Sequence, residues 1–589
     1  MGGTLPLFAV AAVALVITAA AAAAALGLRS PAAYLLSVYL LAAGEIVALT
    51  EVLSLFHEAR RAGYLIGEAF LLVLAALVWL ARGRRRPPLP RVGVAAARRH
   101  PLVVALALLV VASLAFQAFL VVATPPNNPD AMSYHLPRAA EWYHRGAVER
   151  FPVYDERQNA FPPNAEIQIV WTLAFLERDT LAAAPQFLAR IALLLAVYGL
   201  SRRAGFGRPA AAFATLVCSS LTLVVVQAVT TQTDLVTAAF VASAAYLALE
   251  AVLADARAAP LAGLATGLAV GTKWTGAAAI PALALLVLAA TRDPRRLGRL
   301  VLWGAAGIAA VGMASYVRNA AAQSSPFGKT SELGGVSTEA TPFGLLHTLY
   351  RLVLDFADFS SYFKNANEDT SYFGTLGWAL ILPLCAGFIV AWLLRRTHPV
   401  RGALAAAVPI LLVELALTHP YNRFEGRLLI GPVALSAALV GWVYARPWIA
   451  RAVTLLAAVT LVLALVFNEA KPVGIDGTTP VWKQSRLSVQ TLKEPTLGAV
   501  FSAFDTLVPE RANVGGVFDH GVFLYPLYGP ELRRRLFYLP YDAPLEHAER
   551  MGLSWVVFSE RRLLVGPRSG WRFVPLGPTW LLAERNADA

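Results

Sequence analysis

The sequence predicts an all-α membrane protein that crosses the bilayer about 14 times, with long polar loops on one side and a small α/β domain at its C-terminus. Three observations lead to this prediction. First, 57% of the 589 residues are hydrophobic and only 15% are charged, a composition that soluble domains of this size do not have. Second, apolar runs near membrane-spanning length recur from residue 5 to residue 467. Third, basic residues gather in short loops between these runs, as cytoplasmic loops do.

The charge and cysteine content exclude several other classes. A net charge of +13 often indicates a nucleic-acid partner, but here the basic residues flank apolar runs, so we expect no nucleic acid and a partner in membrane lipid. Cys218 and Cys385 each lie inside an apolar run. Neither a disulfide framework nor a cysteine-ligated zinc site is therefore expected.

The basic segment 82–100 sets the orientation of the predicted helices. It should be cytoplasmic, so the polar loops 124–182 and 318–375 face the periplasm or the extracellular side. The region 261–290 has basic residues at both ends and Lys273 in the middle, which favours two short helices with Lys273 at their outer turn. The expected helices are 5–27, 31–50, 62–80, 101–122, 183–201, 209–229, 235–254, two within 261–290, 300–317, 376–394, 402–417, 428–444 and 452–467.

We expect three parts along the chain. Residues 1–100 hold three additional helices and the basic linker, and residues 101–468 form a membrane core with the two outer loops. Residues 469–589 are less apolar and form a small α/β domain outside the membrane. Within loop 318–375, the segment LLHTLYRLVLDFADF has the spacing of an interfacial amphipathic helix. The expected strands of the last part lie in the runs VGGVFDH, RRLFYLP, SWVVFSE and TWLLAER.

The polar stretch from Thr124 to Phe175 is where we expect chemistry. It begins just after an apolar run and concentrates ionisable side chains, and charge kept at a membrane boundary is usually functional. Asp130 is the best candidate for a general base toward a hydroxyl group. The competing interpretation is that Asp130 caps a helix starting at Ala131. The two roles are compatible.

Further charged residues stand at predicted outer helix ends. Asp234 ends the turn TTQTD, Lys273 lies in GTKWTG, and Arg423 and Arg427 lie in NRFEGR. Each has a structural alternative: Asp234 as a helix cap, Lys273 as a side chain that reaches the interface, and the arginines as ordinary flanking charges.

His135 is expected to be a structural hydrogen-bonding group. A divalent metal held by His135, Asp130 and Asp234 is a minority alternative, because imidazole and carboxylate suit such ions.

Several motifs in order resemble the polyprenyl-phosphate-dependent membrane glycosyltransferases of the GT-C class. This class includes protein O-mannosyltransferases, aminoarabinose transferases and lipopolysaccharide core transferases. The resemblance covers about residues 100–589. Its motifs are NPDAMSYHLPRA, FPPNAEI, QTDL, GLATGLAVGTKWTG, NRFEGRLLIGP and VGGVFDHGVFLYPLYG.

The resemblance implies an inverting transfer of a sugar from a polyprenyl phosphate to a hydroxyl of a glycan, lipid or protein, outside the inner or plasma membrane. It implies that Asp130 is the base, followed by Tyr134 and His135 at the substrate, and that Asp234 orients a substrate. The cations listed next would hold the phosphate, whose charge grows during transfer: Lys273, Arg423 and Arg427. No cofactor is required by this assignment, and a divalent metal is optional.

Two departures from the family pattern stand out. Ala131 follows the catalytic Asp where a second acid is common in the family. Phe161 precedes the proline pair where the aminoarabinose transferases have a basic residue, which argues against that activity. The alternative functions are a transporter or lipid-linked-sugar flippase, and an envelope scaffold that docks partners through its tail. The absence of a clear internal repeat disfavours the transporter.

Overall fold

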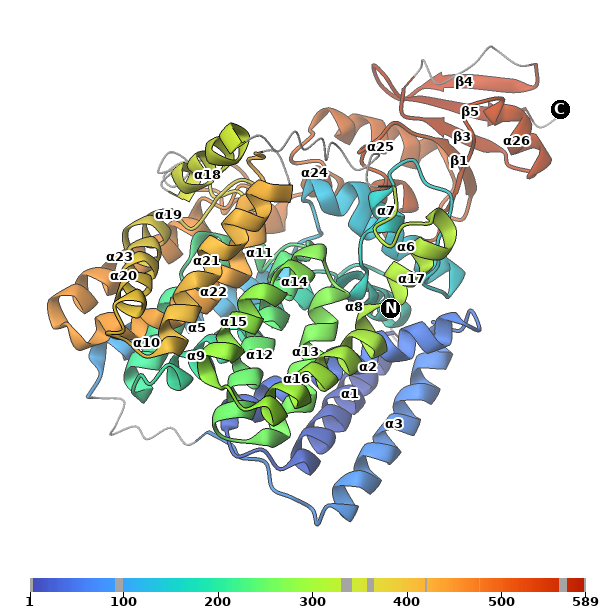
Figure 1. Cartoon of the computed structure of the whole chain (residues 1–589). Coiled ribbons are helices and arrows are strands. Elements are labelled where there is room, and N and C mark those ends of the chain that lie inside the picture. Colours follow the sequence, from blue (N-terminus) through green and yellow to red (C-terminus); the bar gives the residue numbers. More distant parts are fainter. Residues whose placement is uncertain are drawn as a thin grey trace.

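The computed structural model describes residues 4–90, 99–329, 342–356, 365–418, 421–475, 477–560 and 569–586. A bundle of helices makes up most of the molecule, and a small sheet domain stands at one end of it (Figure 1). We call this end of the bundle the domain end. Parts of the expected linker and of the second outer loop, 91–98, 330–341 and 357–364, lie outside the described residues.

Ten helical segments of the described chain are long and apolar enough to cross a membrane. An eleventh candidate is the helix pair Pro294–Gly312 (α16 with η3) and Ala314–Gln323 (α17), bent by 63°. The ten segments are α1 (Thr4–Leu26), α2 (Pro31–Ser54), α3 (Arg61–Ala81), α5 (Pro101–Ala123), α9 (Ala184–Arg203), α12 (Asp234–Leu253), α19 to α20 (Gly374–Leu393), α21 (Pro399–Thr418), η6 to η7 with α22 (Glu425–Ala445) and α23 (Pro447–Val466).

The remaining three predicted helices are present but shorter than a full span. The region 209–229 is divided into α10 (Arg208–Ser219) and α11 (Thr222–Gln227). The region 261–290 is divided into α13 (Ala259–Val270), α14 (Trp274–Ala278) and α15 (Ile280–Ala290). All 14 predicted segments are therefore helical, and the predicted fold class is confirmed. Short helices are tolerated at membrane depth where neighbouring protein covers their ends.

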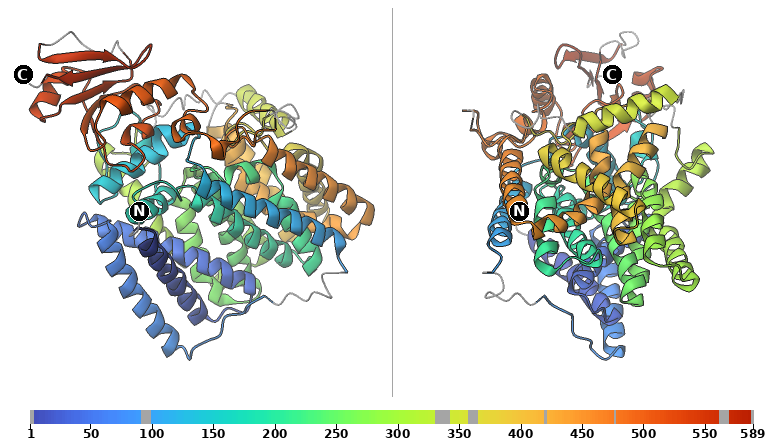
Figure 2. Two further views of the ribbon diagram at one scale, coloured as in Figure 1. Left: turned by 180° about the vertical axis from the view of Figure 1, so that it is seen from behind. Right: turned by 60° about the vertical axis from the view of Figure 1, so that its left-hand side comes forward.

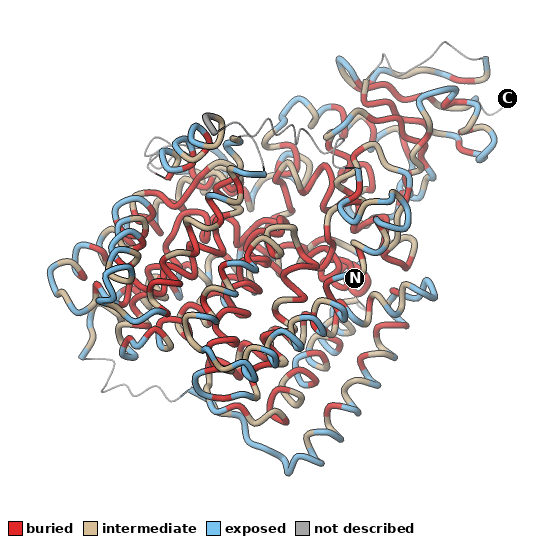
Figure 3. The backbone as a smooth tube through the Cα atoms, viewed as in Figure 1, coloured by how far each residue is buried: buried red, intermediate tan, exposed pale blue. Residues whose placement is uncertain are grey.

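Burial separates central from peripheral helices. In α12, 94% of the most apolar stretch is buried, against 17% in α3 and 22% in α5. Figure 3 shows the buried backbone gathered in the middle of the bundle, and the views of Figure 2 place α1 to α3 along one edge. Large apolar side chains such as Ile66 and Phe70 of α3 are exposed. This is the expected pattern where the surroundings are lipid tails and not water.

Glycines let α13 and α16 approach each other at backbone distance. A Cβ on Gly307 would stand 1.9 Å from the carbonyl oxygen of Gly263, and one on Gly267 would stand 2.1 Å from that of Gly307. Only a residue without a side chain fits such a contact, as in other close helix pairs of membrane proteins. This contact fixes the position of the C-terminal end of α13. Lys273 lies three residues beyond that end, in the junction before α14.

The first outer loop contains several helices. It contains η1 (Ala131–His135), a π-helical turn, then α6 (Leu136–Arg145), α7 (Arg157–Ala160) and α8 (Asn164–Leu176). Every residue of α8 is buried. The sequence analysis treated 164–176 as part of a loop, because the polar stretch before it masked its short apolar run. The predicted amphipathic helix forms α18 (Pro342–Phe356), with Leu346 and Tyr350 exposed.

The C-terminal domain is built on a mixed five-stranded sheet of order β2-β1-β3-β5-β4. β1 pairs in parallel with β2 and β3, and β5 pairs antiparallel with β3 and β4. The predicted runs account for all strands except β4, an edge strand whose terminal proline is tolerated there. The strands are β1 (Asn513–Val517), β2 (Arg535–Tyr538), β3 (Trp555–Phe558), β4 (Trp571–Pro575) and β5 (Leu581–Arg585).

Short helices complete this domain and join it to the bundle. They are η8 (Val481–Lys483), α24 (Arg486–Gln490), α25 (Thr496–Leu507), η9 (Tyr525–Tyr528) and α26 (Pro544–Arg550).

From the close contact between α13 and α16, we predict how a substitution of Gly307 changes the stability of the protein. Gly307→Ala forces the helices apart, because the new methyl group overlaps the Gly263 carbonyl. We expect a loss of about 1–3 kcal/mol, measured as a lower midpoint of thermal unfolding in detergent. Gly304→Ala is the matched control on the same helix, since nothing lies within 4 Å of its Cβ position. Equal midpoints for the two variants would contradict the assigned contact.

Candidate active site

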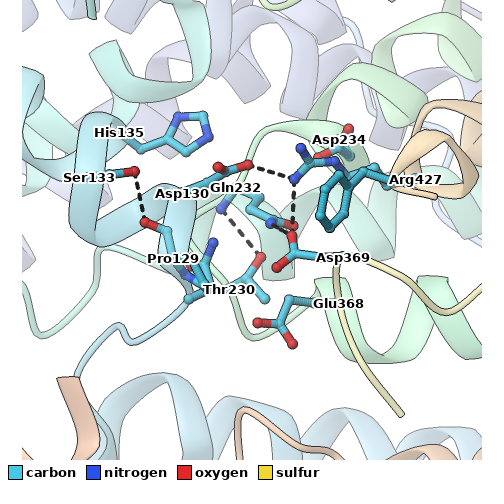
Figure 4. A network of polar contacts seen from close by, with 12 residues as sticks. Pro129, Asp130, Ser133, His135, Thr230, Gln232, Asp234, Glu368, Asp369 and Arg427 are labelled. Atoms are coloured by element: carbon cyan, nitrogen blue, oxygen red, sulfur yellow. Dashed lines mark hydrogen bonds and ion pairs between the residues drawn. The ribbon is translucent and has the colours of Figure 1, made fainter. Parts of the chain in front are cut away.

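Two carboxylates share one arginine at the domain end of the bundle. The Arg427 guanidinium donates to Asp130 at 2.6 Å and to Asp369 at 3.1 Å. Figure 4 shows the three side chains converging from separate segments. Asp130 follows α5, Arg427 lies in the turn before α22, and Asp369 precedes α19. The side chains are 14–17% exposed, so they are largely shielded yet still open to a ligand.

The local backbone explains how Asp130 reaches this position. Asp130 has helical dihedral angles, and its side chain makes no capping hydrogen bond, so the cap role considered above is not adopted. The π-helical turn η1 follows it directly. Such turns widen a helix and are frequent at functional sites. The Met132 carbonyl in this turn accepts a hydrogen bond at 2.9 Å from the backbone N–H of Leu524 in the C-terminal domain.

A second ion pair lies beside the first. The Lys273 ammonium donates to the Asp234 carboxylate at 2.6 Å, and Figure 4 shows Asp234 next to Arg427. Asp234 is the first residue of α12, and Lys273 occupies the junction between α13 and α14. The Lys273 side chain is 20% exposed, whereas that of Asp234 is 2% exposed. The break between the two short helices thus brings a lysine to the cluster without burying it in a continuous helix.

Asp369 was missed in the sequence analysis. It accepts a hydrogen bond from the Gln232 amide as well as from Arg427. Its neighbour Glu368 is fully buried, and neither of its carboxylate oxygens has a hydrogen-bond partner among the described residues. The available signal was the acidic pair in NANEDT, just before the helix expected at 376. It is the same signal that singled out Asp130, a carboxylate next to an apolar run.

Another residue of the first outer loop, Arg157, contacts Asp130 directly. Arg157 contacts Asp130 at 3.4 Å and Asp155 at 2.7 Å, and it lies over the Tyr134 ring at 4.5 Å. Tyr134 is itself buried. Arg157 lies in the polar stretch from Thr124 to Phe175, but its sequence context alone predicts no role for it.

His135 and Arg138 both pair with the buried carboxylate of Glu166 in α8. This agrees with a structural role for His135, as a hydrogen-bonding group that ties η1 to α8.

The ion pairs determine the protonation states. Burial alone would raise the pKa of Asp130, but Arg427, Arg157 and His135 together hold that pKa well below its usual value. Asp130 is therefore ionised at neutral pH. Asp369 behaves differently, because burial raises its pKa and Arg427 offsets this only in part. Burial would also raise the pKa of Glu166, but Arg138 and His135 lower it to about 2.

Comparisons with known proteins agree with this architecture. Residues 163–317 match the family model described as dolichyl-phosphate-mannose-protein mannosyltransferase. The crystal structure of ArnT from Cupriavidus metallidurans bound to undecaprenyl phosphate superposes with a TM-score of 0.51 at 13% identity, over 82% of this chain and 98% of that one. The apo structure of the same protein gives 0.52 at 15% identity, over 84% and 99%. No curated protein sequence matches.

This chain has the GT-C fold. The resemblance inferred from the sequence motifs is thereby confirmed at the level of architecture, including a multi-pass membrane bundle and a separate sheet domain.

The GT-C fold brings most of the predicted site residues together. Asp130, Asp234, Lys273 and Arg427 form the two adjoining ion pairs, and Tyr134 lies in the turn η1 next to them. Arg423 does not join the cluster. Its side chain is exposed and its guanidinium lies over the Phe424 ring at 5.0 Å.

The alternative that His135, Asp130 and Asp234 hold a divalent metal ion is not supported by the arrangement of these side chains. Among the described residues, no group of three or more histidine, cysteine or carboxylate side chains is arranged to hold a metal ion. Asp130 and Asp234 are each paired with a cationic side chain, which a metal ion would have to displace. His135 is engaged with Glu166. These residues, as arranged, do not fit a divalent ion.

Because Arg427 pairs with two carboxylates, we predict that its removal makes the stability of the protein depend on pH. In Arg427→Gln, Asp130 and Asp369 face each other without their common cation, so the pKa values of both carboxyls rise. We expect a loss of stability of up to about 3–5 kcal/mol near neutral pH, partly recovered at about pH 5.5, where one carboxyl takes up a proton.

The native protein should show a smaller recovery, because Asp130 stays ionised at both pH values and only buried carboxyls with a raised pKa, such as Asp369, gain stability on acidification. Its Asp130 pKa is depressed, so the stabilisation from this group is present above the ordinary carboxyl pKa and is lost only at much lower pH. Thermal unfolding at the two pH values measures the effect. Arg423→Gln, an exposed arginine of the same turn, is the control. A pH response of Arg427→Gln equal to that of the control would refute the shared pairing.

Proposed function

We propose that this protein is an integral membrane glycosyltransferase. It would transfer a sugar from a polyprenyl-phosphate donor to a hydroxyl group of a glycan, lipid or protein acceptor, with inversion and with Asp130 as general base. The observation that carries this proposal is the cluster of Asp130, Asp369 and Arg427 beside Asp234 and Lys273. In this cluster, a carboxylate that could act as a base lies next to two cations at the end of a membrane bundle.

The cations are suited to the phosphate of the donor. Lys273 and Arg427 are 20% and 17% exposed, so a ligand that enters the cluster can reach both. Negative charge on the leaving phosphate grows during transfer, and fixed cations stabilise that change. The undecaprenyl phosphate of the similar ArnT structure and the dolichyl phosphate in the matching family's description support a polyprenyl-phosphate donor.

A phosphate that binds Arg427 must compete with two carboxylates. Asp369 is the one that yields more easily, because burial raises its pKa and a protonated carboxyl no longer holds the arginine as an ion pair. Once Arg427 turns partly to the phosphate, its hold on Asp130 weakens. The basicity of Asp130 then rises when the donor is in place, which is when a base is needed.

The transfer itself is a single displacement in this proposal. The acceptor oxygen attacks the anomeric carbon, the bond from that carbon to the phosphate oxygen breaks, and the acceptor proton moves to a carboxylate oxygen of Asp130. One displacement inverts the anomeric centre. Asp234, held by Lys273, would orient a substrate hydroxyl in this proposal.

An aromatic row extends from the cluster. Tyr134, Phe161, Trp274 and Phe327 follow one another in edge-on contacts of 5.1–5.8 Å between ring centroids. Such a row offers an apolar wall for a sugar face or for the first isoprene units of the donor.

The sidedness follows from the basic linker. Arg82, Arg84 and Arg85 follow α3 at the end of the bundle away from the C-terminal domain, so the positive-inside rule assigns that end to the cytoplasm. The cluster and the C-terminal domain are then periplasmic or extracellular, in an inner or plasma membrane. A flippase with the same fold would move the lipid-linked sugar without glycosylating any acceptor.

The base is tested by Asp130→Asn in vesicles that contain the purified protein, a polyprenyl-phosphate sugar and candidate acceptors. We expect transfer to fall by about 10²–10⁴-fold, since the amide cannot accept the proton. Transfer is measured as label moved from lipid to acceptor. Asp542→Asn, an exposed aspartate of the C-terminal domain, is the matched control and should keep full activity.

Two outcomes would overturn the proposal. Unchanged transfer by Asp130→Asn, with the protein folded, would remove Asp130 as the base. Movement of the labelled lipid across the bilayer by the native protein, with no acceptor labelled, would establish the flippase alternative.

A further inference from the structure

A cavity of about 350 Å³ lies outside the cluster, between the first outer loop and the C-terminal domain. Its walls come from 178–180 after α8, from Arg486 at the start of α24, from Glu510, and from the end of η9 with the residues after it, 528–534. The volume lies within the range of small-molecule sites, roughly 300–1,000 Å³. None of its residues is used in the transfer chemistry described above.

The cavity is rich in charge but electrically balanced. Four arginines and three carboxylates line it, and each arginine is paired with an acidic side chain. The pairs are Arg178–Glu531 at 3.3 Å, Arg486–Asp179 at 2.6 Å, Arg533–Glu510 at 3.4 Å and Arg534–Asp505. Asp505 lies outside the lining, and its side chain is 38% exposed. With Asp505 counted, every arginine of the lining has a carboxylate partner, so none is left unpaired for a phosphate or carboxylate ligand.

Balanced donors and acceptors suit a ligand that carries both. Guanidinium groups only donate hydrogen bonds and carboxylates only accept them, whereas each sugar hydroxyl does both. Asp179 and Arg534 are 3% exposed and form a fixed floor. Arg178, Glu531 and Arg533 are 35–44% exposed and form the rim. A polyhydroxylated ring can therefore reach several preoriented donors and acceptors at once.

The cavity is connected to the candidate active site by two hydrogen bonds. Tyr528 of η9 lines the cavity, and its hydroxyl donates to the Glu141 carboxylate in α6 at 2.7 Å. Four residues earlier, the N–H of Leu524 donates to the carbonyl of Met132 in η1. The wall of the cavity and the turn that carries Asp130 thus belong to one bonded assembly.

We propose that this cavity binds a neutral sugar unit of the acceptor. The acceptor would then be a glycan or glycolipid, held at one sugar while another of its hydroxyls reaches Asp130. This inference rests on the proposed glycosyltransferase function, which it narrows to a carbohydrate-bearing acceptor.

Direct binding tests the cavity separately from catalysis. The full-length protein in nanodiscs is examined by saturation-transfer NMR with maltotriose and chitotriose as neutral probes, and with glucose 6-phosphate and inorganic phosphate as anionic ones. We expect the neutral saccharides to bind. Arg178→Gln and Glu531→Gln should each weaken binding by about tenfold, because each removes a charged hydrogen-bonding group from the rim.

The control removes an equivalent group elsewhere in the same domain. Glu584→Gln breaks the pair between Arg572 and Glu584, on β4 and β5, and should leave saccharide binding unchanged. Both rim residues are partly exposed, so the variants are expected to fold, which an unchanged thermal midpoint verifies. In the transfer assay, the rim variants should raise the acceptor KM and leave kcat unchanged.

Three results would overturn the inference. The first is that neither neutral saccharide binds. The second is that saccharide binding does not change in either rim variant. The third is that phosphate binds as tightly as the saccharides, which would make the cavity an anion site. Saccharide binding lost in the rim variants but retained in Asp130→Asn supports the cavity even if no transfer is found. Transfer without saccharide binding would leave the proposed function standing and remove the cavity from it.

Discussion

The bond between Arg427 and its two carboxylates is the constraint on which the domain end of the molecule depends. Asp130 and Arg427 are 297 positions apart in the chain, and Asp369 is 58 positions from Arg427. Three largely buried charges at a membrane boundary are unfavourable unless each has a partner. The turn η1, the turn before α22 and the segment before α19 must therefore meet at one point, or a charge is left unpaired.

For Asp234 and Lys273, the bundle meets this requirement by placing the charge at the end of a helix and not inside a continuous one. Lys273 stands where α13 gives way to α14, and Asp234 stands at the first residue of α12. Close packing of α13 on α16 through Gly263 and Gly307 sets the height at which that interruption occurs. These two charges thus lie at the domain end, while the middle of α12, 235–249, is buried and carries no charged side chain.

The C-terminal domain is part of this arrangement and not an appendage. It supplies Leu524 to the carbonyl left open by the π-helical turn, and Tyr528 to Glu141. Its junction with the first outer loop also forms the charge-balanced cavity. A sheet domain can in this way help to define both the shape of η1 and the cavity that we propose as the acceptor site.

The sequence by itself determined the helical segments, four of the five strands and the candidates Asp130, Asp234, Lys273 and Arg427. These follow from local properties, since apolar length and a charge at the end of a run can be read along the chain. Only the tertiary structure decided which charges meet. Arg423 and Arg427 share one turn, yet packing directs Arg427 inward and leaves Arg423 exposed. Asp369 and Asp130 came to share Arg427 through the meeting of distant segments, and no local pattern records that meeting.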